Sequence, residues 1–174
     1  MLDSDTVTVE ALAAHLHDAL RKALPQNVSD AQVLLRHEVI TSAYYHYTHG
    51  LKKHAGHCQR IAHGHRSRLQ IFINGKRDER QERLWADRWR DIYLGTSADV
   101  VAHGKNRIRF AYRSSEGEFE LELPAERCDL LSTDSTVERI AEHIAERVAE
   151  EKPRMKIEVR AYEGVMKGAV AVAG

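Results

Sequence analysis

The sequence is poor in cysteine: Cys58 and Cys128 are the only two among its 174 residues. A small domain held together by disulfides carries more cysteines than this, so we expect a hydrophobic core and a reducing, cytoplasmic setting. The first ten residues hold Asp3, Asp5 and Glu10 and no basic leader before an apolar run. No secretory signal is therefore expected.

Long apolar runs and net charge are also missing. No apolar stretch approaches the ~20 residues that a membrane-spanning helix needs. The 26 basic side chains balance 26 acidic ones, which gives a formal net charge of zero. The sequence therefore predicts neither a membrane protein nor a basic nucleic-acid-binding surface. The length suits a single domain over 1–174, with residues 1–30 as a helical extension.

Histidine, in contrast, is abundant. The chain holds 11 histidines, and six fall within 20 residues: His46, His49, His54, His57, His63 and His65. That density is the first indication of a chemical site.

The hydrophobic pattern predicts an α+β domain of antiparallel strands with few helices. Helical spacing predicts helices over 9–24 and 136–150, the second opened by a Ser135-x-x-Glu138 capping box. Asn74-Gly75 predicts a turn, and 47–62 a loop. The pattern of segment 77–95 does not decide between a helix and a strand. Strands are predicted over 32–46, 65–73, 156–161 and 168–173, with a hairpin over 107–123 in which arginines face glutamates.

The His63-Gly64-His65 segment suggests a metal site. Residues i and i+2 of a strand point to the same face, so both imidazoles can reach one ion, with Gly64 removing bulk between them. His46, at the end of the preceding predicted strand, is expected as the third ligand. Three imidazoles suit Zn²⁺ and leave a fourth position open, as in catalytic zinc sites. For His49, His54 and His57 we favour the alternative, a solvated loop.

Several motifs carry a family resemblance. Cys58 precedes His63-Gly64-His65, Thr136-Val137-Glu138 opens a predicted helix, and Glu163-Gly164 ends a predicted strand. In this order they resemble the 6-pyruvoyl-tetrahydropterin synthase / 6-carboxy-tetrahydropterin synthase family. The resemblance implies the tunnelling fold (T-fold), in which a four-stranded antiparallel sheet is backed by two helices. Here we expect an N-terminal helix and an inserted β-hairpin in addition. It also implies a homo-oligomer, commonly a hexameric dimer of trimers, with its active site at a subunit interface.

The resemblance further implies roles for single residues. Zinc on His46, His63 and His65 would polarise the side-chain hydroxyls of a dihydropterin. Cys58 would accept a proton as its thiolate. Glu163 would bind the pterin ring, with Thr136 and Glu138 as further substrate-binding residues. Three of these residues also have a purely structural interpretation: Cys58 as a loop thiol, Glu163 as a surface carboxylate and Glu138 as part of a helix cap.

One family feature has no direct counterpart. The family carries an Asp-His dipeptide that activates the cysteine, and the nearest segments here are Asp87-Arg88 and Asp91-Ile92. We expect Asp91 to serve as the acid, with His103 as its substitute histidine partner and His54 or His57 as alternatives.

The expected function is a zinc-dependent lyase acting on 7,8-dihydroneopterin triphosphate, similar to the 6-carboxy-tetrahydropterin synthase of queuosine and deazapurine biosynthesis. Two alternatives stay open. One is a divergent paralog with 6-pyruvoyl-tetrahydropterin synthase or other pterin chemistry. The other is a non-enzymatic oligomer that binds zinc or a pterin.

Overall fold

A computed structural model describes residues 8–36 and 38–174. The chain divides into two compact units, Met1–Val39 and Ile40–Gly174. In the first, α1 (Val9–Lys22) confirms the predicted helix, and the Thr8 hydroxyl accepts a hydrogen bond from the Ala11 N–H at 3.1 Å. The prediction of one domain with an extension over 1–30 stays a prediction.

The predicted strand over 32–46 is wrong. Within the described residues, the first strand, β1, spans Tyr44–His49, and 30–36 and 38–43 form no helix or strand. Leu34 and Val39 are 68% and 83% exposed. Strand propensity is realised only where a sheet neighbour and a buried face exist, and this apolar run has neither.

The main sheet lies in Ile40–Gly174 and has the strand order β10-β9-β2-β1-β4-β8, with β3 paired to β2. The first four form antiparallel pairs, but the sheet as a whole has seven strands and not the four that were expected. β4 and β8 extend that sheet through parallel pairing. The remaining bounds are β2 (His63–Ile73), β3 (Lys76–Arg77), β4 (Arg90–Thr96), β8 (Cys128–Leu131), β9 (Ile157–Gly164) and β10 (Lys167–Ala173).

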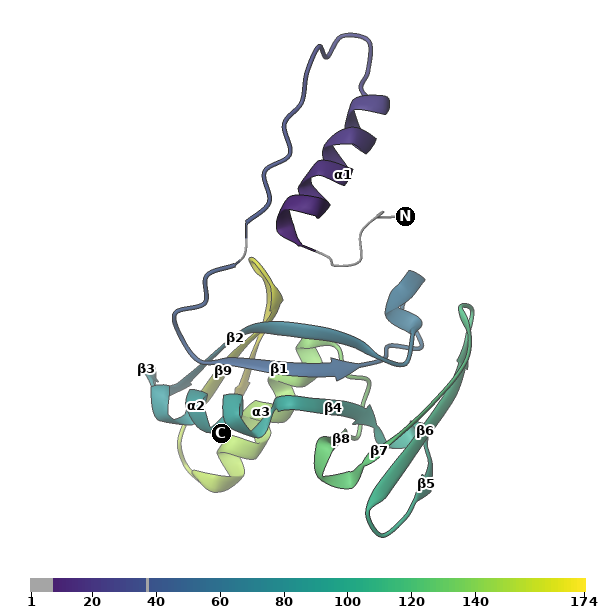
Figure 1. Cartoon of the computed structure of the whole chain (residues 1–174). Helices are drawn as coiled ribbons and strands as arrows, with labels where there is room; N and C mark the ends of the chain where they lie inside the picture. Colours follow the sequence, from purple (N-terminus) through teal and green to yellow (C-terminus); the bar gives the residue numbers. More distant parts are fainter. Residues whose placement is uncertain (1–7, 37) are drawn as a thin grey trace. The chain divides into compact units, whose positions relative to one another are not determined.

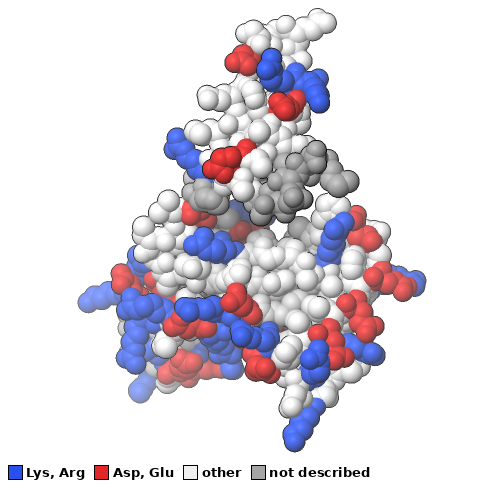
Figure 2. All heavy atoms as spheres, in the orientation of Figure 1, with Lys and Arg blue, Asp and Glu red and all other residues white. Residues whose placement is uncertain are grey.

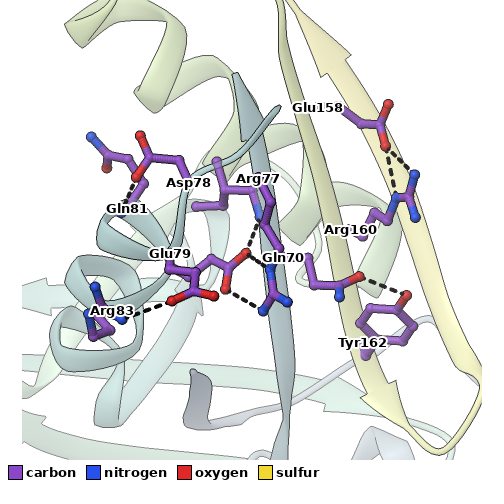
Figure 3. Close-up of polar contacts among 11 residues, drawn as sticks. Gln70, Arg77, Asp78, Glu79, Gln81, Arg83, Glu158, Arg160 and Tyr162 are labelled. Carbon is purple, nitrogen blue, oxygen red and sulfur yellow. Dashed lines mark hydrogen bonds and ion pairs between the residues drawn. The ribbon is translucent and has the colours of Figure 1, made fainter. Parts of the chain in front are cut away.

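Two helices lie on the same face of this sheet, α2 (Glu79–Arg88) and α3 (Val137–Glu151) (Figure 1). The segment 77–95 that the sequence left open is thus a helix followed by β4. Asp78 caps α2 by accepting a hydrogen bond from the Gln81 N–H at 3.0 Å (Figure 3). The core between helices and sheet is apolar and aromatic, and its fully buried members include Trp89, Tyr45, Tyr47, Ile140, Ile144 and Val159.

The start of α3 differs from the prediction. Its N-cap is Thr136, which makes no side-chain capping hydrogen bond. The predicted Ser135-x-x-Glu138 capping box is therefore wrong. Ser135 is fully buried and turns toward β1.

The structure confirms the predicted turn at Asn74-Gly75 and the predicted hairpin over 107–123. Asn74 and Gly75 join β2 to β3 with φ of 50° and 78°, the left-handed values of the predicted tight turn. A separate three-stranded sheet contains β5 (Val100–His103), β6 (Arg107–Ser114) and β7 (Gly117–Pro124). Its β6–β7 hairpin carries the predicted arginine–glutamate pairs, among them Arg109–Glu120 at 3.4 Å.

The surface carries no dominant sign of charge on the face of Ile40–Gly174 that Figure 2 shows, where basic and acidic side chains are intermingled. Among the described residues, no helix has the length and apolar character needed to cross a membrane.

Candidate functional site

Three imidazoles converge where β1 and β2 pair. His49 ends β1, and His63 and His65 open β2. The antiparallel register places His49 opposite His63 and Tyr47 opposite His65. One ring nitrogen from each histidine lies within 4.8 Å of the other two. This spacing is small enough for one ion to bind all three.

Alternation along the two strands explains the convergence. In β1 the buried positions are Tyr45, Tyr47 and His49, so the histidine continues the row of core tyrosines. In β2, His63 and His65 point to the same face because they are two residues apart. A Cβ added at Gly64 would make only ordinary contacts, 3.7 Å from the Tyr47 carbonyl oxygen. The convergence therefore does not require glycine there.

Outer contacts fix two of the rings. Nδ1 of His49 lies 2.9 Å from the Ser135 carbonyl oxygen and 2.9 Å from its hydroxyl. Nδ1 of His65 lies 3.2 Å from the Glu163 carbonyl oxygen. Because a carbonyl only accepts, Nδ1 carries the proton in both rings, which leaves each Nε2 with a free lone pair. This is the usual arrangement of a metal-binding histidine.

Several nitrogens of the cluster are buried without a partner. Nε2 of His49 and both ring nitrogens of His63 make no hydrogen bond within the described residues. A buried polar atom left unpaired costs roughly 1–3 kcal/mol. A divalent cation would accept these lone pairs, so the donor set fits Zn²⁺, which favours imidazole ligands.

Electrostatics favour the neutral form of two of the rings. Burial, together with the neighbouring His63 and His65, lowers the pKa of His49 to about 3. Burial also lowers the pKa of His63. A neutral imidazole is the form that binds metal.

The predicted third ligand is wrong: the structure groups His49, not His46, with His63 and His65. His46 is three residues from His49, so it lies on the opposite, exposed face of β1. There its Nδ1 pairs with Asp91 Oδ1 at 2.5 Å. The prediction ended the strand at residue 46, whereas β1 continues to His49.

The predicted substrate-binding residues lie at the start of α3 and near the end of β9. Glu163, on β9, forms an ion pair with Lys167 of β10. That carboxylate raises the pKa of the Lys167 ammonium, and the charges of Cys58 and Glu138 raise it further. Glu138 lies in the first turn of α3, where its own N–H and the Thr136 hydroxyl lower the pKa of its carboxyl. The direct contact of the Lys167 ammonium is with the Glu163 carboxylate.

Cys58 lies on the short 3-10 helix η1 (Gly56–Gln59) and is exposed. Cys128 is partly buried against the three-stranded sheet, in agreement with a packing role. The thiol that the prediction selected is thus the accessible one.

Asp91 and His103 are not brought together. His103 is exposed at the end of β5, in the separate three-stranded sheet. The partner of Asp91 is His46 instead. Asp91 has φ of 57°, a left-handed conformation that few non-glycine residues adopt. The Asp91–His46 pair lines two cavities of about 510 and 440 Å³.

Solved structures share this fold at low sequence identity. A 6-pyruvoyl tetrahydropterin synthase from Plasmodium falciparum is 15% identical, with a TM-score of 0.55 over 75% of this chain and 91% of that one. The synthase from Plasmodium vivax, as a variant with a catalytic glutamate replaced by alanine, is 14% identical, with a TM-score of 0.57 over 75% and 91%. At this identity the likeness shows the fold alone.

Sequence comparison gives a more specific result. No curated protein sequence matches the chain. The family model described as 6-pyruvoyl tetrahydropterin synthase, however, matches residues 38–173, which is most of the chain and nearly all of its second unit. The chain therefore belongs to the 6-pyruvoyl tetrahydropterin synthase family and has its tunnelling fold.

Proposed function

We propose that this protein is a zinc-dependent lyase acting on 7,8-dihydroneopterin triphosphate, with 6-carboxy-tetrahydropterin as its favoured product. One observation carries the proposal. One ring nitrogen from each of three histidines lies within 4.8 Å of the other two, and His49 and His63 have buried nitrogens without a hydrogen-bond partner among the described residues, in a chain of the pterin synthase family.

His49, His63 and His65 would hold the zinc. Bound zinc supplies a Lewis acid that lowers the pKa of the substrate's side-chain hydroxyls. The protein's contribution is to fix the ligands: Ser135 and the Glu163 carbonyl hold the rings so that each Nε2 faces the site.

Cys58 is the proposed proton acceptor. Its exposure lets a substrate approach. The thiolate is the reactive form of cysteine.

Glu163 is the proposed anchor for the pterin ring. A carboxylate can accept two parallel hydrogen bonds from adjacent N–H groups of a heterocycle. Its side chain is only 12% exposed, which strengthens such bonds. Thr136 and Glu138, at the start of α3, are proposed as the neighbouring substrate contacts.

Asp91 and His46 are proposed as the acid–base pair that replaces the family's Asp-His dipeptide. His46 lies on the face of β1 opposite to the proposed ligand His49 and pairs there with Asp91 of β4, so within one chain the pair does not reach the metal. In the homo-oligomer that we propose, a hexameric dimer of trimers, the pair serves the site of a neighbouring copy.

The exposed histidines favour a second candidate function, a non-enzymatic zinc- or pterin-binding oligomer. His54 and His57 are both exposed. Metal stoichiometry separates the two functions, because one ion per chain fits an active site and several ions fit a metal buffer.

The decisive experiment incubates the zinc-loaded protein with 7,8-dihydroneopterin triphosphate and measures triphosphate release and the pterin products. We expect release that stops on chelation and returns with zinc. The product distinguishes the carboxy from the pyruvoyl reaction. Absence of release at full zinc occupancy would exclude the lyase.

A further inference from the structure

The η1 helix, which carries Cys58, is held by its neighbour Gln59. The Gln59 side chain is buried, with the residue 7% exposed. Its amide nitrogen donates to the His54 carbonyl. Its amide oxygen accepts from the Ser115 hydroxyl at 2.8 Å and from the Glu116 N–H at 3.0 Å. Both ends of the amide are therefore paired, one within the loop and one with a distant turn.

That turn belongs to the β6–β7 hairpin, more than 50 residues away in the sequence. Figure 1 shows the hairpin beside the short helix that follows β1. The Tyr112 hydroxyl of the hairpin also donates to the Gln59 carbonyl oxygen at 2.8 Å. The hairpin thus makes hydrogen bonds to both the side chain and the main chain of Gln59.

Two further contacts join the same segments. Glu116 Oε2 lies 3.2 Å from His57 Nδ1, on the other side of Cys58 from Gln59. A Cβ added at Gly50 would lie 2.1 Å from the Tyr112 hydroxyl, which shows how closely the hairpin packs against the start of the loop. The residues on both sides of Cys58 are therefore bound by the hairpin turn.

The two ends of the loop are also held elsewhere: Lys52 and Lys53 pair with Asp99 and Asp134, and the Tyr93 hydroxyl donates to the Ile61 carbonyl. The loop's internal backbone bonds include Leu51 N–H to the Cys58 carbonyl at 2.9 Å and Arg60 N–H to the His57 carbonyl at 3.1 Å. Most of its side chains from Lys53 to Cys58 are exposed. An exposed loop with few buried contacts opens easily unless something else restrains it. Next to Cys58, the hairpin supplies such a restraint through Gln59.

We propose that Gln59 is a positioning residue for Cys58, and that the β6–β7 hairpin is a clamp that holds the thiol in register with the histidine cluster. The inference rests on the proposed role of Cys58 as proton acceptor. Gln59 touches neither the metal ligands nor the substrate in this account, and it acts through the loop. Misplacing a catalytic group by ~1 Å costs on the order of 10²-fold in rate.

The test removes hydrogen bonds from the hairpin side and leaves the loop sequence intact. Tyr112→Phe with Ser115→Ala deletes two of the bonds to Gln59 and keeps the apolar packing of the ring. The matched control, Arg113→Gln, breaks the exposed Arg113–Glu118 ion pair of the same hairpin without touching the loop. Gln59→Leu is the complementary loop-side variant.

Three readouts are needed: amide hydrogen exchange of residues 51–61, the alkylation rate of Cys58, and kcat with KM at verified zinc content. We expect the double variant to exchange faster over 51–61, to change the Cys58 alkylation rate, and to lose roughly 10- to 100-fold in kcat with KM and zinc content near wild type. The control should match wild type in all three.

Unchanged exchange in the double variant would overturn the clamp. Faster exchange with wild-type kcat and an unchanged alkylation rate would overturn the positioning role. If the wild-type protein itself shows no lyase turnover, the proposed function fails separately. The hydrogen-exchange rates of residues 51–61 and the alkylation rate of Cys58 then still show whether the hairpin holds the loop.

Discussion

The hydroxyl of Ser135 lies 2.9 Å from Nδ1 of His49, although 86 residues separate the two. The start of α3 is thereby joined to the end of β1. The sequence predicted a helix cap at Ser135 and a loop histidine at His49, and the contact joins Ser135 to the histidine cluster.

Ser135→Ala should weaken zinc binding. Outer partners of metal ligands typically contribute 10–100-fold to affinity. Since the Ser135 carbonyl also accepts from His49 and persists in the variant, we expect a loss near the lower bound, about tenfold. Competition with a chromogenic chelator measures it. Ser132→Ala, on the exposed turn before α3, is the control, and equal affinities for both variants would refute the role of Ser135.

His49→Ala and His46→Ala should differ in metal content. Loss of His49 removes a ligand and should leave the purified protein largely free of zinc. Loss of His46 removes only the contact with Asp91 and should leave zinc content at the wild-type level. Elemental analysis after dialysis decides between them. A reversed result would restore the ligand set first predicted from the sequence.

Asp91→Asn and Cys58→Ala should complement each other. Each variant alone should have low turnover with normal zinc content. When the two are unfolded together, refolded and reloaded with zinc, some sites should combine an intact Cys58 with an intact Asp91–His46 pair from a neighbouring copy. Activity above the sum of the separate variants is expected, and purely additive activity would argue against a shared site.

His143 should make the fold sensitive to acid. Its ring stacks on Trp89 at 6.1 Å between centroids, and burial lowers its pKa, with Arg147 and Arg88 acting in the same direction and Asp129 and Glu146 opposing it. The unfolded chain binds this proton near pH 6.5, whereas the folded chain does so only at lower pH. The free energy of unfolding therefore falls as pH drops through about 6.5.

Urea unfolding at pH 7.5 and pH 5.5 tests this expectation. His143→Gln should show a smaller loss of stability between the two pH values than wild type does. His103→Gln, at an exposed position, should behave as wild type does. A pH dependence that is identical in all three proteins would contradict the assignment.

Ile144→Ala should destabilise the second unit strongly. Ile144 is fully buried between α3 and the sheet, and such truncations cost roughly 2–5 kcal/mol. Leu84→Ala, at a position 52% exposed on α2, should change stability by less than about 0.5 kcal/mol. Denaturant unfolding with matched m-values gives both numbers.

Local patterns predicted much of this fold. The 107–123 hairpin was predictable because alternation, turn residues and facing charges all agree within 17 consecutive positions. The 136–150 helix was predictable from its apolar stripe. The bounds of β1 were not predictable in the same way. They depend on which residues of β1 pair with β2 and β4, and the local sequence does not indicate that pairing.

The site was predicted in part. His63 and His65 follow from two-residue spacing alone. His49 carried a usable signal, since it continues the alternation of Tyr45 and Tyr47, but a strand ended at residue 46 concealed it. The Asp91–His46 pair spans 45 residues and two parallel strands, so no sequence period could have indicated it.

The Lys167–Glu163 ion pair has a consequence for ligand choice. In the proposed role of Glu163, an incoming molecule would have to displace the ammonium from the carboxylate or share the carboxylate with it. A flat heterocycle with two adjacent N–H groups would replace the lost ion pair with two hydrogen bonds. Compounds that resemble only the hydroxylated side chain of the proposed substrate should therefore bind weakly.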